Sequence, residues 1–317
     1  MAYVRVLESS NVPVIFEIEH LAQLLGRKVS FLHKVASSPD HFYRNFSIPK
    51  RHGGFRTLCA PYPSLKECQR WILDEILARK RCSPSSVGFT HGKSILDHAG
   101  PHVGSREILV LDIRDFFPSI CVSKVISVFR GFGYTQDISQ LLGRLCCRSG
   151  VLPQGAPTSP ALANLVCRRL DARLRKSAKK SGLTFTRYAD DLCFSGEKIP
   201  PGFESLVHQI TKREGFLIKQ EKSRQFSERD TRRLVTGLNV TMTDLRVTRQ
   251  YKRDLRTALY YINKYGLQSH MAKNKVRDPM YVQRLLGKVG FWRHVEPESD
   301  EAQAFAHRLR ELVPYLE

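Results

Sequence analysis

The stretch Val110-Leu111-Asp112-Ile113-Arg114-Asp115-Phe116-Phe117 lies within an apolar run, Glu107–Phe117, that is stopped by Pro118 and has the pattern of a buried strand. A second stretch, Thr184–Gly196, alternates apolar and polar residues around Tyr188-Ala189-Asp190-Asp191, which predicts a hairpin with two acids at its tip. The sequence therefore predicts that an acid-bearing strand lies beside an acid-tipped hairpin.

Three acids in this arrangement, Asp112, Asp190 and Asp191, have the chemistry of a magnesium site. An adjacent Asp pair is usually only turn chemistry, but the upstream acid-bearing strand reverses that expectation. Nucleotidyl transfer uses two divalent ions about 3.5–4 Å apart. Magnesium prefers oxygen ligands, and clustered carboxylates repel one another without a cation. We therefore expect two Mg²⁺ ions bound by these three residues.

The Y-A-D-D box resembles the catalytic hairpin of reverse transcriptases, and V-L-D-I-R-D-F-F resembles the first catalytic strand of that family. The resemblance implies an α+β right-hand polymerase fold with fingers, a palm of antiparallel sheet and helices, and a short helical thumb. It predicts N-terminal helices and fingers over residues 1–100. It also predicts a catalytic palm, with part of the fingers inserted, over 101–247, and a thumb over 248–317.

Two further segments resemble the substrate-binding parts of the family. Ile48-Pro49-Lys50 with Gly53, Gly54 and Arg56 resembles the fingers hairpin, which implies that Arg56 meets the incoming triphosphate, with Arg114 as a second candidate. The nine residues Leu152–Pro160 match the loop-to-helix segment, which implies that Gln154 packs near the nucleotide. Gly155 permits close backbone approach there. Taken alone, these segments are a basic turn and a Pro/Gly linker.

The resemblance also assigns roles to Lys222 and Phe117. Gly215–Ser223 resembles the next family motif, whose lysine lies near the leaving pyrophosphate. Lys222 would then act as a general acid or a fixed positive charge, although an exposed lysine is more often mere surface. Phe117 is expected beneath the sugar of the deoxynucleotide. Because strict alternation would instead put Phe116 on the face of Asp112, this requires a turn between Ile113 and Pro118.

Two features resemble retron enzymes within the family. Val235-Thr236-Gly237 matches their V-T-G box, and it predicts a contact with RNA; an ordinary strand with a glycine bulge is the alternative. Ser94–His102 resembles their N-A-x-x-H element, with Ala99 and His102 matching but His98 in place of Asn. We make no catalytic claim for His102.

The retron resemblance implies an enzyme that copies a cognate structured non-coding RNA into RNA-linked DNA from deoxynucleotides, with an effector protein in anti-phage defence. The alternatives are a reverse transcriptase of group II intron or diversity-generating lineage, and a non-catalytic RNA-binding palm scaffold. An RNA-dependent RNA polymerase is disfavoured because those enzymes typically carry G-D-D.

Charge and composition agree with a nucleic-acid partner. With 51 Lys+Arg against 30 Asp+Glu, the formal charge of the 317 residues is +21. A membrane surface is the competitor, but the basic residues are spread along the chain. No signal peptide or spanning segment is evident, so we expect a cytoplasmic protein with eight reduced cysteines. The basic segment Arg249–His294 precedes the acid-rich Glu296–Glu317, and we expect Lys252, Arg253 and Arg256 to bind RNA.

Helices are predicted from apolar periodicity and from caps. Their ranges are Ile18–Leu25, Leu65–Lys80, Ser123–Phe132, Gln136–Cys147, and one from Ser159-Pro160 to about Lys180. The last carries Arg169, Arg173, Lys176 and Lys180 on one face, which is either a solvated face or a phosphate contact.

Overall fold

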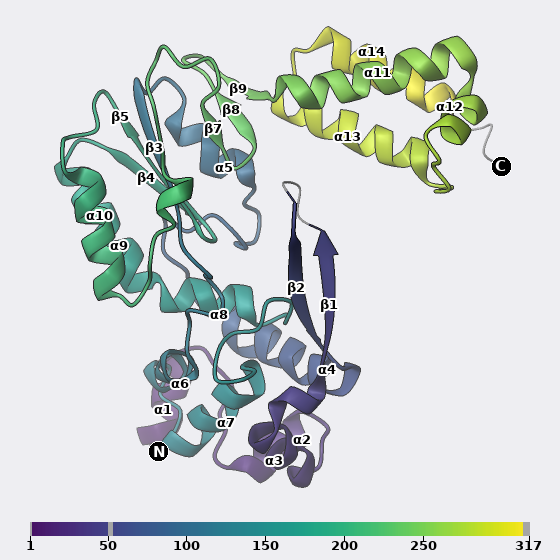
Figure 1. Ribbon diagram of the computed structural model, residues 1–317. Helices are drawn as coiled ribbons and strands as arrows, with labels where there is room; N and C mark the ends of the chain where they lie inside the picture. Colours follow the sequence, from purple (N-terminus) through teal and green to yellow (C-terminus); the bar gives the residue numbers. More distant parts are fainter. Residues whose placement is uncertain (1, 50–52, 313–317) are drawn as a thin grey trace. The chain divides into compact units, whose positions relative to one another are not determined.

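A computed structural model describes residues 2–49 and 53–312 (Figure 1). The chain forms two compact units. The first comprises Met1–Ser94, Leu109–Phe194 and Ile199–Arg224, and the second comprises Ile95–Ile108, Ser195–Lys198 and Gln225–Glu317. These two units are defined by contacts between residues and not by the parts of a polymerase. The boundaries of fingers, palm and thumb therefore stay a prediction.

The described strands form three sheets. The first is the antiparallel pair β1 (Tyr43–Pro49) and β2 (Phe55–Pro61). The second has the order β4-β5-β3-β6, with the bounds Thr184–Tyr188, Asp191–Gly196, Glu107–Asp112 and Arg224–Phe226. The third, β7-β8-β9, is antiparallel and covers Leu234–Val235, Leu238–Val240 and Leu245–Val247. Helices with antiparallel sheets confirm the predicted α+β class.

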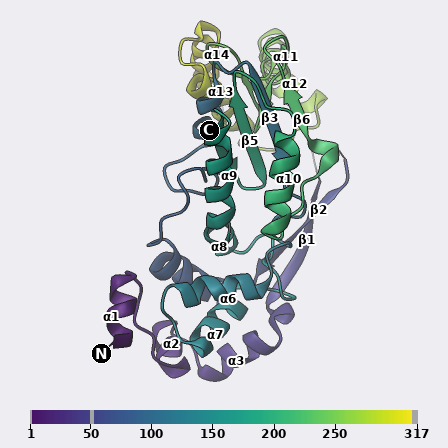
Figure 2. The ribbon, with the colours of Figure 1, turned by 90° about the vertical axis from the view of Figure 1, so that its left-hand side faces the viewer.

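The first unit contains most of the helices. They are α1 (Ala2–Ser9), α2 (Ile18–Leu24), α3 (Val29–Ser37), α4 (Pro63–Trp71), α6 (Val122–Gly131), α7 (Gln136–Cys146), α8 (Ser159–Val166), α9 (Arg168–Lys180) and α10 (Phe203–Arg213), with a π-helical turn at Ile72–Leu77. The helices α9 and α10 lie side by side against the β4-β5-β3-β6 sheet (Figures 1 and 2). The amphipathic pattern of α9 explains this, since its apolar stripe, Leu170, Leu174 and Ala178, is buried.

Most predicted elements of the first unit are confirmed to within a few residues, and two need correction. The helix predicted from Ser159 to Lys180 is interrupted at Cys167, so that α8 and α9 are separate helices. The apolar run Glu107–Phe117 is a strand only as far as Asp112, and the chain then turns over residues 114–119. Proline has no backbone N–H to donate to a strand ladder, so the strand ends and the chain turns before Pro118 is reached. The predicted β1–β2 hairpin is present, but Lys50 lies outside the described residues.

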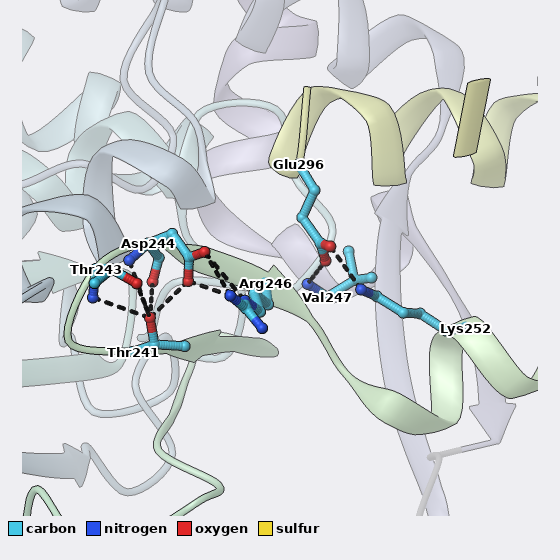
Figure 3. Close-up of polar contacts among 7 residues, drawn as sticks. All are labelled: Thr241, Thr243, Asp244, Arg246, Val247, Lys252 and Glu296. Atoms are coloured by element: carbon cyan, nitrogen blue, oxygen red, sulfur yellow. Dashed lines mark hydrogen bonds and ion pairs between the residues drawn. The ribbon is translucent and has the colours of Figure 1, made fainter. Parts of the chain in front are cut away.

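The second unit joins the β7-β8-β9 sheet to a helical bundle. The bundle consists of α11 (Arg249–Tyr265), α12 (Leu267–Lys273), α13 (Tyr281–Val295) and α14 (Asp300–Glu311), and the unit also holds α5 (Ile95–Ala99). Trp292 is fully buried in the bundle. Glu296 joins the two parts, because its carboxylate accepts hydrogen bonds from Val247 N at 2.9 Å and from Lys252 Nζ at 2.6 Å (Figure 3).

Among the described residues, no helix is both long and apolar enough to cross a membrane. All eight cysteines are free thiols.

Candidate active site

The three predicted carboxylates lie together in the first unit. Asp112 is the buried last residue of β3, and the neighbouring strand β5 begins with Asp191 directly after the turn that holds Asp190. A backbone hydrogen bond of 2.9 Å from Ile113 N to Asp190 O fixes the turn against the end of β3. Regular strand pairing therefore places all three acids at one edge of the sheet.

The electrostatics of this cluster favour a bound cation. Burial, followed by repulsion from Asp190 and Asp112, raises the pKa of Asp191 to about 7. The pKa of Asp190 is also raised, again chiefly by burial and then by Asp112. A cation among these oxygens would relieve both the repulsion and the desolvation.

Two lysines hold Asp112. Lys222 Nζ donates to Asp112 Oδ2 at 2.8 Å, and Lys219 Nζ lies 2.8 Å from Oδ1, which itself makes no hydrogen bond. The hydrogen bond to Asp112 raises the pKa of Lys222, so this lysine is cationic at neutral pH. Sequence reasoning missed Lys219, although its position three residues before Lys222 was a usable signal.

The donor chemistry fits magnesium, since all three side chains offer carboxylate oxygens and the pKa values of Asp190 and Asp191 are raised. Within residues 2–49 and 53–312, however, no three His, Cys, Asp or Glu side chains converge closely enough to form a metal cage. Lys219 and Lys222 hold the carboxylate of Asp112 in its present position.

A buried brace that sequence reasoning missed supports the Asp190-Asp191 turn. Arg187, fully buried, binds both carboxylate oxygens of Asp171 at 2.6 and 2.9 Å. It also donates to Asn164 Oδ1 at 3.2 Å and to the carbonyl of Ala189 at 3.0 Å. Ala189 has φ +55, and the arginine holds this left-handed residue directly before the two acids. Arg187 in Thr184–Gly196 was visible as a charge at a strand position, which is the only signal the sequence carried.

Gly88 also packs against this turn. A Cβ on Gly88 would lie 2.6 Å from Ala189 N, so only glycine allows this backbone to approach the turn. The Gly88 carbonyl accepts from Asn164 Nδ2 at 2.8 Å, which ties it to the same brace. Phe89 follows with φ +60 and half of its surface exposed.

The predicted turn between Ile113 and Pro118 is present, and it separates the two phenylalanines. Phe116 is buried and contacts Phe216, which is the position of a core residue. Phe117 is half-buried, with its ring 6.1 Å from Phe89, a further aromatic that sequence reasoning missed. The role of Phe117 beneath the sugar stays a prediction.

The Gln154 loop is joined to the β1–β2 hairpin. Cys59 N donates to Gln154 O at 2.8 Å, and a Cβ on Gly155 would lie 3.0 Å from Cys59 O. Gly155, at φ +126, therefore permits close approach to β2. Arg56 is exposed on the same strand, three residues from Cys59. The structure thus brings two predicted substrate segments together.

Arg114 is exposed on the turn after β3. Its side chain is 3.9 Å from Glu221 and lines a cavity of about 340 Å³ with Lys212, Phe216 and Leu217. The three acids do not line that cavity. The roles of Arg114 and Arg56 at the triphosphate both stay predictions.

In the second unit, Val235-Thr236-Gly237 forms the tight turn between β7 and β8. Both Thr236, at φ +45, and Gly237, at φ +84, are left-handed, as a two-residue hairpin turn requires. A β-branched residue is strained there, and Thr236 Oγ1 is buried without a hydrogen bond. The turn replaces the glycine bulge considered from the sequence.

The histidines of the N-A-x-x-H-like element are core residues of the second unit. His98 and His102 are both fully buried, with ring centroids 6.2 Å apart. His102 Nδ1 lies 2.6 Å from Ser195 Oγ, and burial lowers the pKa of His102 to about 4. Both histidines thus have the surroundings of core residues that stabilise the fold.

Two of the three predicted RNA-binding cations of α11 are paired with carboxylates. Lys252 is paired with Glu296, as Figure 3 shows, and Arg256 binds both oxygens of Glu301 at 2.5 and 2.6 Å. Arg253 is exposed. On α9, likewise, Arg169 and Arg173 bind Glu214, which lowers the pKa of that carboxyl. Sequence reasoning missed these acidic partners because they lie far along the chain.

Comparison with known families gives a match over most of the chain. A family model described as "Reverse transcriptase (RNA-dependent DNA polymerase)" matches residues 48–277. The chain is 35% identical over 260 residues to the retron Ec86 reverse transcriptase of Escherichia coli, covering 81% of each protein. It is 34% identical over 335 residues to the retron Mx162 reverse transcriptase of Myxococcus xanthus, covering 93% of this chain and 66% of that protein.

A second Myxococcus xanthus protein, the retron Mx65 reverse transcriptase, is 37% identical over 275 residues, which cover 79% of this chain and 64% of that protein. The chain thus spans about two thirds of the two Myxococcus proteins. Among solved structures, a telomerase from Candida albicans with a fragment of telomeric RNA matches 90% of this chain and 67% of its own, at a TM-score of 0.47 and 12% identity.

Proposed function

The chain belongs to the reverse transcriptase family, as a relative of retron enzymes, and we propose that it copies part of a cognate structured non-coding RNA into single-stranded DNA that stays linked to that RNA. RNA-directed DNA polymerisation itself follows from membership of the family. The observation that carries the proposed chemistry is the meeting of Asp112, Asp190 and Asp191 at one sheet edge beside Lys219 and Lys222.

In this proposal the three carboxylates hold two Mg²⁺ ions, which would activate the attacking hydroxyl and neutralise the triphosphate. The protein's own residues set the geometry. Arg187 keeps the hairpin turn rigid through the Ala189 carbonyl. Lys222 supplies a fixed positive charge close to Asp112, where the pyrophosphate would leave.

The remaining substrate roles follow the residues that the structure brings together. We propose that Arg56 contacts the triphosphate from the β1–β2 hairpin and that Gln154 and Gly155 line the nucleotide site beside it. Phe117 would lie beneath the sugar and exclude a 2′-hydroxyl. Arg114 remains the second candidate for the triphosphate.

The retron assignment rests on the relatives and on the β7–β8 turn. Thr236 combines a strained left-handed backbone with a buried hydroxyl that has no hydrogen bond, and such residues cluster at functional sites. We propose that the turn formed by Val235, Thr236 and the exposed Gly237 contacts the cognate RNA, and that the Thr236 side chain turns outward when the RNA binds. The protein would work in the cytoplasm, and its RNA and DNA product would join an effector protein in anti-phage defence.

The decisive experiment is expression of the protein with the RNA encoded beside its gene. We expect DNA that debranching enzyme releases from RNA, because a retron enzyme starts from an internal 2′-hydroxyl. A product that starts from an RNA 3′ end would instead assign the enzyme to a group II intron-like or diversity-generating lineage. A purified protein that binds RNA but extends no primer would support the scaffold alternative.

Thr236 variants test the RNA contact separately from the fold. Thr236→Gly removes the hydroxyl and relieves the strain, so we expect higher stability together with weaker use of the cognate RNA. Thr236→Asn tolerates the left-handed backbone and restores a polar group, so it should recover part of the loss. Equal activity of all three proteins on the cognate RNA would exclude the contact.

A further inference from the structure

The end of α11 carries an unusual group of exposed aromatic rings. Tyr260, Tyr261 and Tyr265 are 55%, 36% and 54% exposed. Positions four apart share a helix face, so Tyr261 and Tyr265 stack, with ring centroids 6.0 Å apart and planes tilted by 18°. Tyr260 lies beside them, 5.4 Å from Tyr261. Large rings usually bury their surface, so three together at the surface indicate a contact site.

Two lysines lie against these rings. Lys264 Nζ is 5.6 Å from the ring centroid of Tyr260 and 5.3 Å from that of Tyr265. Lys273, at the end of α12, is 5.5 Å from the ring of Tyr261. Neither lysine forms an ion pair in the part of the chain that the structure describes. Their charge is therefore available to an anionic ligand.

The surrounding sequence has one sign of charge. Residues 260–277 contain Lys264, Lys273, Lys275 and Arg277 but no Asp or Glu. A polyanion is the complementary partner for such a segment. Flat rings beside cations match a ligand that offers both flat faces and phosphates, which is the chemistry of unpaired nucleotides. A perfect duplex hides its base faces, so unpaired bases fit these rings better.

We propose that Tyr260, Tyr261 and Tyr265, with Lys264 and Lys273, form a stacking site for unpaired bases of an RNA. The site rests on the proposed function in that its occupant is the template RNA of the polymerase. Bases stack on the exposed rings, and the lysines bind the adjoining phosphates. This locates RNA contact at the C-terminal end of α11 rather than at the paired cations of its N-terminal half.

The test measures binding of a short labelled oligouridylate RNA to the full chain. Leucine at all three tyrosines keeps the helix but removes the rings, so affinity should fall at least about tenfold, since each stacked base contributes between about fivefold and a hundredfold. Phenylalanine at the same positions should restore most of the affinity. Tyr62→Leu, at another exposed tyrosine, is the matched control and should bind as wild type.

Salt dependence separates the two parts of the site. The leucine variant should keep the wild-type salt slope because stacking releases no counterions, whereas Lys264→Gln with Lys273→Gln should lower it by up to about 1.4. Unchanged affinity of the leucine variant, or an equal loss for an RNA duplex of the same length, would overturn the inference. Asp190→Asn should abolish DNA synthesis yet bind the oligonucleotide normally, so the polymerase assignment stands or fails independently.

Discussion

Charged side chains are arranged in opposite ways in two regions, the sheet edge of the first unit and the N-terminal half of α11 in the second unit. At the sheet edge Asp190 and Asp191 are crowded together and partly buried, and their pKa values rise. Along α11 Lys252 and Arg256 each meet a carboxylate from a neighbouring element. Like charges held together against repulsion indicate a cation-binding site, whereas satisfied pairs indicate internal structure.

The number of charged residues in a segment does not by itself locate a binding surface. A net charge of +21 correctly indicates a polyanionic partner. Yet two cations of α11, Lys252 and Arg256, are paired with Glu296 and Glu301, and two cations of α9 are paired with Glu214. What marks a contact surface is the absence of such acids, as along residues 260–277.

The largest effect should come from the crowded acids. Asp190→Asn keeps the shape but removes one charge, so DNA synthesis should fall by several orders of magnitude because metal binding is lost. The same change should raise the thermal stability of the metal-free protein, since it removes repulsion. Primer extension with titrated magnesium and thermal melting are the measurements. Synthesis near the wild-type rate would remove the metal assignment.

The buried brace should give the next effect. Arg187→Met leaves Asp171 ionised and unpaired, which should destabilise the protein by about 3–5 kcal/mol. Adding Asp171→Leu removes the orphaned charge and should recover most of that stability. DNA synthesis by the double variant should nevertheless stay about 10- to 100-fold low, because the Ala189 carbonyl has lost its donor. If the double variant polymerises normally, the pair serves only the fold.

The sequence predicted that Asp112, Asp190 and Asp191 lie near one another because the determinants of that arrangement are local. Strand alternation, the Asp190-Asp191 turn and the stop at Pro118 are all set by neighbours in the chain. The pairing of Arg187 with Asp171 could not be predicted, because the two residues meet only when α9 packs on β4. The sequence around an arginine in a strand does not show which acid will pair with it. Pairing of Lys252 with Glu296 escaped prediction for the same reason, across 44 residues.

A pH effect should come from the second unit, where His102 is a buried histidine whose pKa is lowered. Burial depresses the pKa of His102 from 6.5 to about 4. The folded state therefore binds fewer protons, and stability present above pH 6.5 is lost as pH falls toward 4, by up to about 3 kcal/mol. Urea unfolding of wild type and His102→Asn at both pH values measures it. A loss equal in the two proteins would contradict the assignment.

The two phenylalanines of the turn after β3 should differ in their effect on the choice between ribonucleotides and deoxynucleotides. Phe117→Ala should raise ribonucleotide incorporation relative to deoxynucleotide, on the order of ten- to a hundredfold, because the ring no longer opposes a 2′-hydroxyl. Phe116→Ala should instead lower stability by about 3–5 kcal/mol, since this ring is buried. Competition assays with both nucleotides decide between them. Ribonucleotide use by the Phe116 variant alone would make Phe116 the gate.

The smallest effect should come from α11, and it tests the contrast between paired and unpaired cations within one helix. Arg253 is exposed, so Arg253→Gln should lower the salt slope of RNA binding by about 0.7–0.9 for the single phosphate it neutralises. Arg256→Gln should leave that slope unchanged, because Glu301 already neutralises the guanidinium. Lys252→Gln should also leave the slope unchanged but lower stability, because Glu296, which also holds Val247 N, would lose its cation. Binding titrations from low to high salt compare the three. Equal flattening by all of them would mean that RNA displaces the acids, and that the ion pairs seen along α11 open when RNA binds.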